Sequence, residues 1–487
     1  MGSMRAMGKM GVRAAAMLLL FSVTAFAEQR FPPPDFEGGH QLPITSTPAA
    51  RAIAFQYLDV AVLVGALGLA LWLIYRTRSR KGLTALSIFS VAYFGFCRKG
   101  CICAIGSVQN VALGLFDPHY ALPLSAIAFF LAPLVVALFA GRAFCSAVCP
   151  HGAIQDLVLI KPVKVPAWLE HALGLIPYFF LGAGMIFAAT GSAFVICRFD
   201  PFVPFFRFSG STALLALGAA FLAVGMFVGR PYCRFLCPYG ALLAMASSLS
   251  KWRVRVTPDT CTQCRLCEHS CPYGAMREPA SDSANPRELG ADRKRLGGLL
   301  LLLPVLIALG GFAGSKLGPA ACRVDRTVHL AEHYAANQKA PIQNGVATPE
   351  ALELQRAEKN PEELLAAALA IRHRFTLAGW LFGAWVGLVI GAKLILLSVR
   401  QNRTDFEPDR AACYACARCF ESCPSELLRI GIELTRHPKA VEHHSTTRRY
   451  REPDGVMCRA PASCSACGAP PLWEKTLISH RATNSTL

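Results

Sequence analysis

The stretch that decides the fold is Cys261-Thr-Gln-Cys264-Arg-Leu-Cys267-Glu-His-Ser-Cys271-Pro272. A second stretch, Cys413-Tyr-Ala-Cys416-Ala-Arg-Cys419-Phe-Glu-Ser-Cys423-Pro424, repeats its spacing. In such a run the first three thiolates hold one [4Fe–4S] cluster and the fourth binds the other cluster, whereas zinc sites usually pair two Cys-x2-Cys arms. We therefore predict two [4Fe–4S] clusters, one on Cys261, Cys264, Cys267 and Cys423, and the other on Cys413, Cys416, Cys419 and Cys271.

Composition places these runs in a membrane protein. Hydrophobic residues make up 53% of the 487 residues and charged residues only 16%, which is too apolar for an ordinary soluble domain. Apolar runs near the length of a bilayer predict about seven transmembrane helices after a signal peptide. These predicted spans are residues 54–75, 83–96, 122–140, 170–190, 211–229, 297–314 and 376–398.

The charge pattern gives the orientation. The net charge is +18, and most basic residues cluster beside the apolar runs on alternate sides, as the positive-inside rule requires. This distribution argues against nucleic acid as a partner and puts both cysteine runs in the cytoplasm. Arg98 is one of a few basic residues on the outer side, and we expect such charges to have a local partner, such as a cluster or an anionic cofactor. Asp59 is the main acid within a span.

The gap between the two runs is also informative. Residues 272–412 contain two predicted spans, so the chain returns to the side it left. We predict a polytopic α-helical membrane protein that carries one cytoplasmic, split 2[4Fe–4S] ferredoxin-like (α+β) module. The predicted parts are a signal peptide 1–27, a periplasmic arm 28–53, a five-helix bundle 54–250, a first ferredoxin half 251–290, a transmembrane helix 297–314, a periplasmic segment 315–375, a transmembrane helix 376–398, a second ferredoxin half 405–430 and a cytoplasmic tail 431–487.

The signal peptide is predicted from three features. Arg5, Lys9 and Arg13 precede an apolar stretch, and Ala25-Phe26-Ala27 fits a cleavage site of small residues. An uncleaved anchor helix is the alternative, although the apolar stretch is shorter than a membrane span.

A repeated motif supplies four further cysteines. Gly141-Arg142-Ala-Phe-Cys145-x3-Cys149-Pro150 and Gly229-Arg230-Pro-Tyr-Cys233-x3-Cys237-Pro238 are close copies. Their four thiolates are enough for a third cluster, but a redox-active dithiol or structural cysteines that pack as small hydrophobes fit as well. The repetition suggests a pseudo-symmetric bundle.

Two other groups of cysteines are less specific. Cys97, Cys101, Cys103 and Cys197 are expected on the outer side, where they can ligate a further cluster or where Cys97 and Cys101 can form a disulfide. The tail holds Cys458, Cys464 and Cys467, which suit zinc if a histidine joins them but equally fit a plain tail.

The repeated motif, from Gly141 to Gln155 and from Gly229 to Gly240, together with the two ferredoxin runs, resembles the NosR/NapH family of membrane polyferredoxins. The phrases Cys197-Arg-Phe-Asp-Pro-Phe and Val328-His-Leu-Ala-Glu332 look more like the NosR branch. The resemblance covers about residues 54–430. It implies electron carriage between quinol or a cytoplasmic donor and a periplasmic acceptor, which in the NosR branch supports nitrous-oxide reductase. That branch also carries a large flavin domain at its N-terminus, for which no counterpart is found, so flavin is expected only from a partner.

We therefore expect an iron–sulfur electron-transfer protein of the bacterial inner membrane, multi-pass, with its clusters on the cytoplasmic side. Its expected partners are a quinol or cytoplasmic donor and a periplasmic flavin-binding or reductase protein. The alternative is a redox-sensing regulatory or maturation factor for a periplasmic metalloenzyme. No residue stands out as a catalytic acid, base or nucleophile.

Overall fold

A computed structural model describes residues 52–100, 103–256, 261, 264–279, 286–339, 361–399, 403, 405–429, 450–451 and 457–458. The predicted signal peptide, nearly all of the periplasmic arm and most of the tail lie outside the described residues, as does Cys101. The chain divides into two compact units. Unit 1 comprises Met1–Val254 and Pro272–Ala417, and unit 2 comprises Arg255–Cys271 and Arg418–Leu487.

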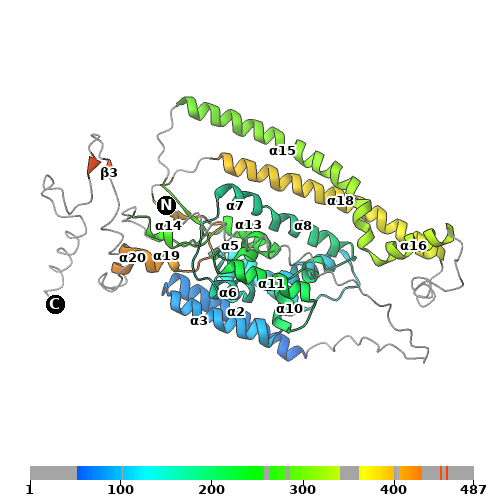
Figure 1. Cartoon of the computed structure of the whole chain (residues 1–487), viewed down its shortest axis with the longest axis horizontal. Coiled ribbons are helices and arrows are strands. Elements are labelled where there is room, and N and C mark those ends of the chain that lie inside the picture. Colours follow the sequence, from blue (N-terminus) through cyan, green and yellow to red (C-terminus); the bar gives the residue numbers. More distant parts are fainter. Residues whose placement is uncertain are drawn as a thin grey trace, which may run out of the picture. The chain divides into compact units, whose positions relative to one another are not determined.

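Unit 1 is almost entirely helical (Figure 1). Its first part contains α2 (Ile53–Tyr75), α3 (Arg80–Ser90), the π-helix η1 (Val91–Cys97), α4 (Ala104–Phe116), α5 (Leu124–Ala140), the π-helix η2 (Phe144–Val148), α6 (Pro150–Leu157), α7 (Ala167–Leu173) and α8 (Ile176–Ala189). There follow α9 (Val195–Arg198), α10 (Phe202–Arg207), α11 (Thr212–Gly225), α12 (Pro231–Phe235), α13 (Pro238–Ser248), β1 (Met276–Arg277), α15 (Pro286–Ala321), the 3₁₀ helix η3 (Cys322–Val324), α16 (Arg326–Lys339), α18 (Pro361–Ser398) and β2 (Glu407–Pro408).

Unit 2 is small. It holds the short helices α14 (Leu266–Ser270), α19 (Arg418–Ser422) and α20 (Pro424–Arg429), and an antiparallel pair formed by β3 (Tyr450–Arg451) and β4 (Met457–Cys458).

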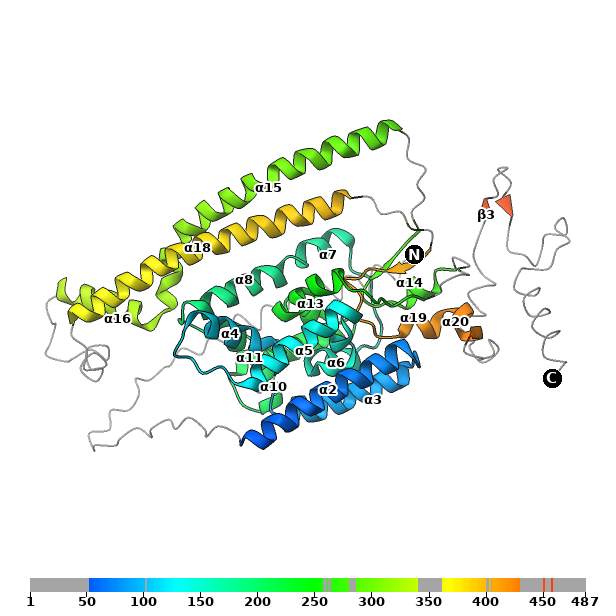
Figure 2. The same ribbon diagram turned by 180° about the vertical axis from the view of Figure 1, so that it is seen from behind.

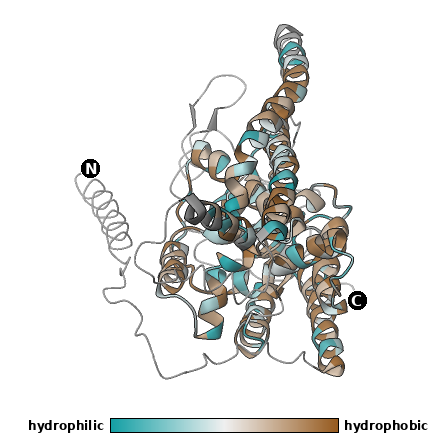
Figure 3. Ribbon diagram, turned by 90° about the vertical axis from the view of Figure 1, so that its right-hand side faces the viewer, coloured by the Kyte–Doolittle hydropathy of each residue, from teal (hydrophilic) through white to brown (hydrophobic). Residues whose placement is uncertain are grey.

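Four helical segments in the described part of the chain are long and apolar enough to cross a membrane: Ile53–Tyr75, Ala167–Ala189, Asp292–Val324 and Glu362–Ser398. Three of the other predicted spans are shorter here, because α5 and α11 have 17 and 14 residues, and residues 83–96 divide between α3 and η1. Apolar residues dominate most of the helices (Figure 3). The chain is therefore a membrane protein, while the number of spans stays a prediction.

Two long helices, α15 and α18, lie side by side, and α8 packs against α18 (Figures 1 and 2). Glycines spaced four residues apart line both sides of the α15–α18 contact. A Cβ at Gly383 would meet the backbone of Gly310 and Gly314, and a Cβ at Gly314 would meet the backbone of Gly379. The helices touch backbone to backbone, as small-residue stripes allow in membrane proteins.

At one end of this helix pair, the chain folds back into a compact cap. Cys322, Val328, Leu364 and Phe375 belong to its buried core. The Cys322 thiol donates a hydrogen bond to the Pro319 carbonyl over 2.9 Å, as expected of a structural cysteine. The helix α18 begins at Pro361, so it includes residues 361–375 of the segment 315–375 that is predicted to lie between two spans.

The flanks of the two ferredoxin runs meet within unit 1. Strand β1 pairs antiparallel with β2, with Met276 opposite Pro408 and Arg277 opposite Glu407. An ion pair of 3.1 Å joins Arg277 to Asp409. The hairpin of α15 and α18 therefore leaves and returns to the same small sheet, while one ferredoxin module divided by an insertion stays a prediction.

Candidate functional site

Four cysteines come together inside unit 2. Helix α14 packs against α19, and Cys267 and Cys423 are both buried, with 8% and 9% of their surface exposed. The neighbouring thiols with the largest electrostatic effect on Cys267 are those of Cys264, Cys423 and Cys261. Burial, followed by these neighbouring thiols, raises the pKa of Cys267 to about 12. The sequence predicts these four cysteines, one of them from the distant run, as the ligands of one cluster, and that role stays a prediction.

The other predicted ligand set is divided between the units. Cys413 and Cys416 belong to unit 1, and Cys271 and Cys419 belong to unit 2. Their assignment to one cluster stays a prediction from the run's spacing.

A second group of four cysteines lies inside unit 1. Cys145, Cys149, Cys233 and Cys237 are all buried, and none exposes more than 7% of its surface. The charges of Cys233, Cys149 and Cys145 all act on Cys237, so the four thiols form one group. The two copies of the repeated motif, which are more than 80 residues apart in the sequence, thus lie together in the structure.

The Cys-Pro step of each motif starts a helix. Cys149 precedes Pro150, the first residue of α6, and Cys237 precedes Pro238, the first residue of α13. Proline suits this position because the first helical N–H has no partner within the helix. The Cys237 sulfur accepts a hydrogen bond of 3.3 Å from the Gly240 N–H, which caps α13. Amide groups at the start of a helix favour negative charge on such a sulfur.

Each motif also contains a glycine that permits a close approach. A Cβ at Gly152 would lie 3.2 Å from the Cys145 carbonyl oxygen, and a Cβ at Gly240 would lie 3.1 Å from the Cys233 carbonyl oxygen. These matching contacts fold both Cys-x3-Cys segments in the same way. The structure therefore supports the internal repeat that the sequence indicates.

The arginines of the repeat are exchanged between its two copies. Arg230 belongs to the second motif, but its guanidinium donates to the carbonyl oxygens of Cys145 and Ser146 in the first, the latter over 2.8 Å. Arg142 belongs to the first motif, and its Nη2 would lie 3.2 Å from a Cβ at Gly240 in the second. Both side chains are buried, with 5% of Arg142 and none of Arg230 exposed.

The loop 411–417, which carries Cys413 and Cys416, packs on this four-cysteine group. The Arg142 guanidinium lies 4.1 Å from the centre of the Tyr414 ring and donates to the Ala411 carbonyl over 3.2 Å. The Tyr414 hydroxyl donates to the Cys233 carbonyl over 3.3 Å. The Arg80 side chain donates to the Cys416 carbonyl over 3.3 Å. Part of the second ferredoxin run is therefore fixed beside the cysteines of the bundle.

Polar side chains complete the site. Buried Gln155 donates to the Cys233 sulfur over 3.3 Å and accepts from the Tyr232 N–H over 3.0 Å. His151 is fully buried, and its Nε2 lies 3.2 Å from a carboxylate oxygen of Asp200. Sequence reasoning missed these roles, although both Gln155 and His151 stand inside the quoted motif.

The cysteines predicted on the outer side stay possible ligands of a further cluster or partners in a disulfide. Cys97 and Cys197 are exposed, Cys103 is half-buried, and Cys101 lies outside the described residues. The outer charge at Arg98 does have the expected local partner, because it lies 2.9 Å from buried Asp59.

The chemistry of the four-cysteine group fits an iron–sulfur cluster. No three Cys, His, Asp or Glu side chains among the described residues are close enough to share one metal ion. In a [4Fe–4S] cluster, however, each thiolate binds its own iron, so the sulfurs lie farther apart than around a single ion. The Nε atoms of Arg142 and Arg230 are buried without a hydrogen-bond partner. Such orphaned cationic donors beside four thiols suit a negatively charged group bound by thiolates.

Comparison with known proteins places iron–sulfur domains on the same residues. A 4Fe-4S binding domain matches twice, over residues 122–166 and 211–257, so each match contains one copy of the repeated motif. Another 4Fe-4S binding domain matches residues 254–277, which contain the first ferredoxin run. No solved structure matches the chain.

Several curated proteins are similar over part of the chain. YccM of Escherichia coli (strain K12), whose name proposes a role in electron transport, is 29% identical over 31% of this chain and 45% of its own length. Protein NirI of Paracoccus denitrificans is 35% identical over 27% of this chain and 21% of its own length. Regulatory protein NosR of Pseudomonas aeruginosa is 30% identical over 26% of this chain and 19% of its own length. The chain thus spans less than half the length of these relatives. Its repeated motif, its 4Fe-4S binding domains and its relatives support a membrane protein of the NosR/NapH polyferredoxin type.

Proposed function

We propose that this protein relays electrons between a quinol or cytoplasmic donor and a periplasmic acceptor, a flavin-binding or reductase protein. Iron–sulfur electron transfer itself is supported by the matched domains and by the relatives. The proposed ligands are the eight cysteines of the two ferredoxin runs for two clusters, and Cys145, Cys149, Cys233 and Cys237 for a third. An iron–sulfur cluster, when bound, supplies a site that accepts and gives up one electron at a time.

One observation carries the proposal of a third centre in the route. The loop that bears Cys413 and Cys416 contacts the four-cysteine group directly through Tyr414 and Arg142. Electron tunnelling weakens steeply with distance, so a carrier needs its redox sites close together. The chain's own residues provide this closeness, and they also exclude water from the buried thiols.

The proposed location is the bacterial inner membrane with the ferredoxin runs on the cytoplasmic face. Basic residues beside the predicted spans support this orientation through the positive-inside rule. Clusters on one face are separated from the other face by roughly 30 Å of hydrocarbon, so a route to the periplasm needs a site within the bundle. The four-cysteine group, which contacts the loop 411–417, would extend the route from the ferredoxin runs into the bundle.

The test uses the full chain, purified anaerobically and inserted in lipid vesicles. A quinol or a reduced cytoplasmic carrier is added, and the reduction of the iron–sulfur signals is followed by EPR and visible absorbance. Electron transfer predicts reduction within seconds and reoxidation by an acceptor on the opposite side. It also predicts that Cys145→Ser with Cys233→Ser stops delivery to that acceptor while the ferredoxin signals remain. Reduction with no delivery by the unaltered chain would refute the relay.

A second function has one specific observation in its favour, because two of the similar proteins are named Regulatory protein NosR. In this alternative the clusters sense redox state or help to mature a periplasmic metalloenzyme. The Cys264→Ala variant separates the two functions in cells. A fully metallated but inactive partner enzyme supports electron transfer, and an unmetallated or unexpressed partner supports maturation or regulation.

A further inference from the structure

The four-cysteine group is surrounded by an excess of buried positive charge. Asp156 is buried and lies 2.5 Å from Arg80 and 3.6 Å from Arg230. The Tyr273 hydroxyl donates to the same carboxylate over 2.7 Å. Arg142 has no carboxylate partner among the described residues, and its charge acts on Cys145, Cys237 and Cys233. Arg80 and Arg230 thus share one carboxylate while Arg142 has none, so the ion pairs of the described residues leave two of these three positive charges without a carboxylate.

Burying uncompensated charge is costly, so an arrangement like this needs a reason. The backbone of Arg230 adds to the cost, because its φ of 51° lies in the left-handed region that residues other than glycine rarely adopt. Contacts to the loop 411–417 do not account for all of this charge, because Arg142 makes the hydrogen bond to Ala411 and lies 4.1 Å from the Tyr414 ring centre, whereas Arg230 lies 5.3 Å from that centre. The excess charge instead matches the four buried thiols, which become negative when they bind iron.

We propose that Arg142 and Arg230 are positioning residues that neutralise the thiolate-bound centre of the repeated motif and raise its reduction potential. This inference rests on the proposed third centre. Reduction adds one electron, supplied by the protein's electron donor, and makes the centre more negative. A fixed positive charge nearby therefore favours the reduced form over the oxidised form. The exchange of arginines between the copies gives each Cys-x3-Cys segment one cation from the other copy.

The size of the effect follows from Coulomb's law. A unit charge about 10 Å away, at an effective dielectric constant of about 20, changes the equilibrium between oxidised and reduced forms by more than about tenfold. For a one-electron centre, tenfold corresponds to about 59 mV. Arg253 provides a matched control, because it carries the same charge but sits in a partly exposed ion pair with Glu407 over 3.2 Å. Solvent and salt screen such a charge.

The experiment is an EPR redox titration of the full chain in detergent, with iron content measured on the same samples. The variants are Arg142→Gln, Arg142→Lys and Arg230→Gln, with Arg253→Gln as control. In both Arg142→Gln and Arg230→Gln, we expect the midpoint potential of one centre to become more negative. The shift should correspond to at least about a tenfold change in the equilibrium constant between the oxidised and reduced forms. We expect Arg142→Lys to stay near the unaltered value and Arg253→Gln to show no shift.

Each outcome bears on the inference. Unchanged midpoints in Arg142→Gln and Arg230→Gln samples that retain their iron would overturn it. If the Gln variants lose iron, retention of iron in Arg142→Lys supports the role of charge, and equal loss in Arg142→Lys overturns it. The proposed third centre is tested separately. If Cys145→Ser with Cys233→Ser retains all of the iron, the centre itself is refuted, whatever the arginine variants do.

Discussion

Replacing Gly383 by alanine should loosen the hairpin that joins the two ferredoxin halves. Gly383 lies where α18 touches α15, and an added Cβ would meet the backbone of Gly310 and Gly314. Backbone atoms in a helix cannot rotate away as a side chain can. The helices must therefore move apart along their contact.

The magnitude can be worked from two opposing effects. Overpacking a close contact costs about 1–3 kcal/mol. Alanine also gains up to about 1 kcal/mol over glycine through its helix propensity. Gly298, on the same helix pair, has no atom within 4 Å of a Cβ, so Gly298→Ala experiences only the favourable effect. We expect Gly383→Ala to be less stable than Gly298→Ala by about 1–3 kcal/mol.

The assay is reversible unfolding of the full chain in mixed detergent micelles of increasing SDS fraction, followed by tryptophan fluorescence. The difference between the two alanine variants cancels the helix-propensity effect and isolates the contact. Equal midpoints for Gly383→Ala and Gly298→Ala would refute the backbone-to-backbone packing of α15 on α18.

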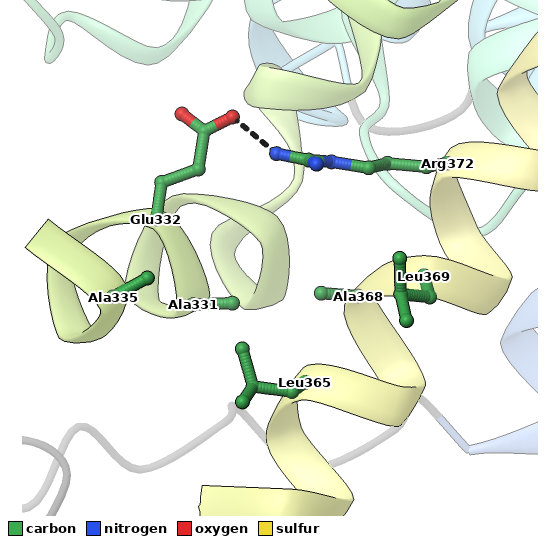
Figure 4. Close-up of a pocket in the computed structure, with 7 residues that line it drawn as sticks. All are labelled: Ala331, Glu332, Ala335, Leu365, Ala368, Leu369 and Arg372. Atoms are coloured by element: carbon green, nitrogen blue, oxygen red, sulfur yellow. Dashed lines mark hydrogen bonds and ion pairs between the residues drawn. The ribbon is translucent and has the colours of Figure 1, made fainter.

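Two further predictions concern charged residues. Replacing Asp156 by asparagine should make the midpoint potential of the proposed third centre more positive, opposite to the effect of Arg230→Gln. The reason is that the change removes the only carboxylate paired with Arg230 among the described residues. An EPR titration that finds a more negative midpoint potential would contradict this. At the pocket shown in Figure 4, desolvation opposes the ionisation of Glu332, but hydrogen bonds from Arg372 and Arg323 outweigh it and lower the pKa of that carboxyl below 4.5. A carboxyl whose pKa is lower in the folded protein than in the unfolded chain stabilises the fold when the pH is above its unfolded-state pKa. This stabilisation is lost as the pH falls through the folded-state pKa. Thermal unfolding should therefore show an acid-dependent loss below pH 4.5 that Glu332→Gln abolishes, and an identical acid response in Glu332→Gln would exclude this carboxyl as the cause.

The sequence allowed the long helices to be predicted because their signal is local. The span predicted at 54–75 corresponds to α2, Ile53–Tyr75, since an uninterrupted apolar run specifies a helix without reference to the rest of the chain. Helix ends were less predictable where packing extends them. The predicted span 297–314 lies inside α15, which runs from Pro286 to Ala321, because glycine contacts with α18 continue past its apolar centre.

The sequence predicts ligands for the site but not their surroundings. The spacing of the cysteines alone indicated that Cys423 joins Cys261, Cys264 and Cys267, and all four lie in the same unit. The repeated Gly-Arg step before each Cys-x3-Cys-Pro was visible as a repeat. Its exchange of arginines was not, because it depends on how two copies more than 80 residues apart are placed in space.

Some charges could be recognised as unusual before their partners were known. Asp59 in a span and Arg98 on the outer side were each unexpected under the hydropathy and positive-inside rules. The structure pairs them at 2.9 Å, and the Tyr93 hydroxyl donates to the same carboxylate over 2.9 Å. A sequence can therefore mark a buried charge as needing a partner, but the identity of that partner depends on the tertiary packing of helices.

The measurement that tests the central claim most directly is the iron and acid-labile sulfide content of the anaerobically purified chain, compared with that of its Cys145→Ser, Cys233→Ser variant. Three clusters of four irons predict about 12 iron atoms per unaltered chain and about 8 per variant chain, with one EPR signal missing in the variant. Equal iron content and identical spectra in the two proteins would contradict a third centre in the helical bundle.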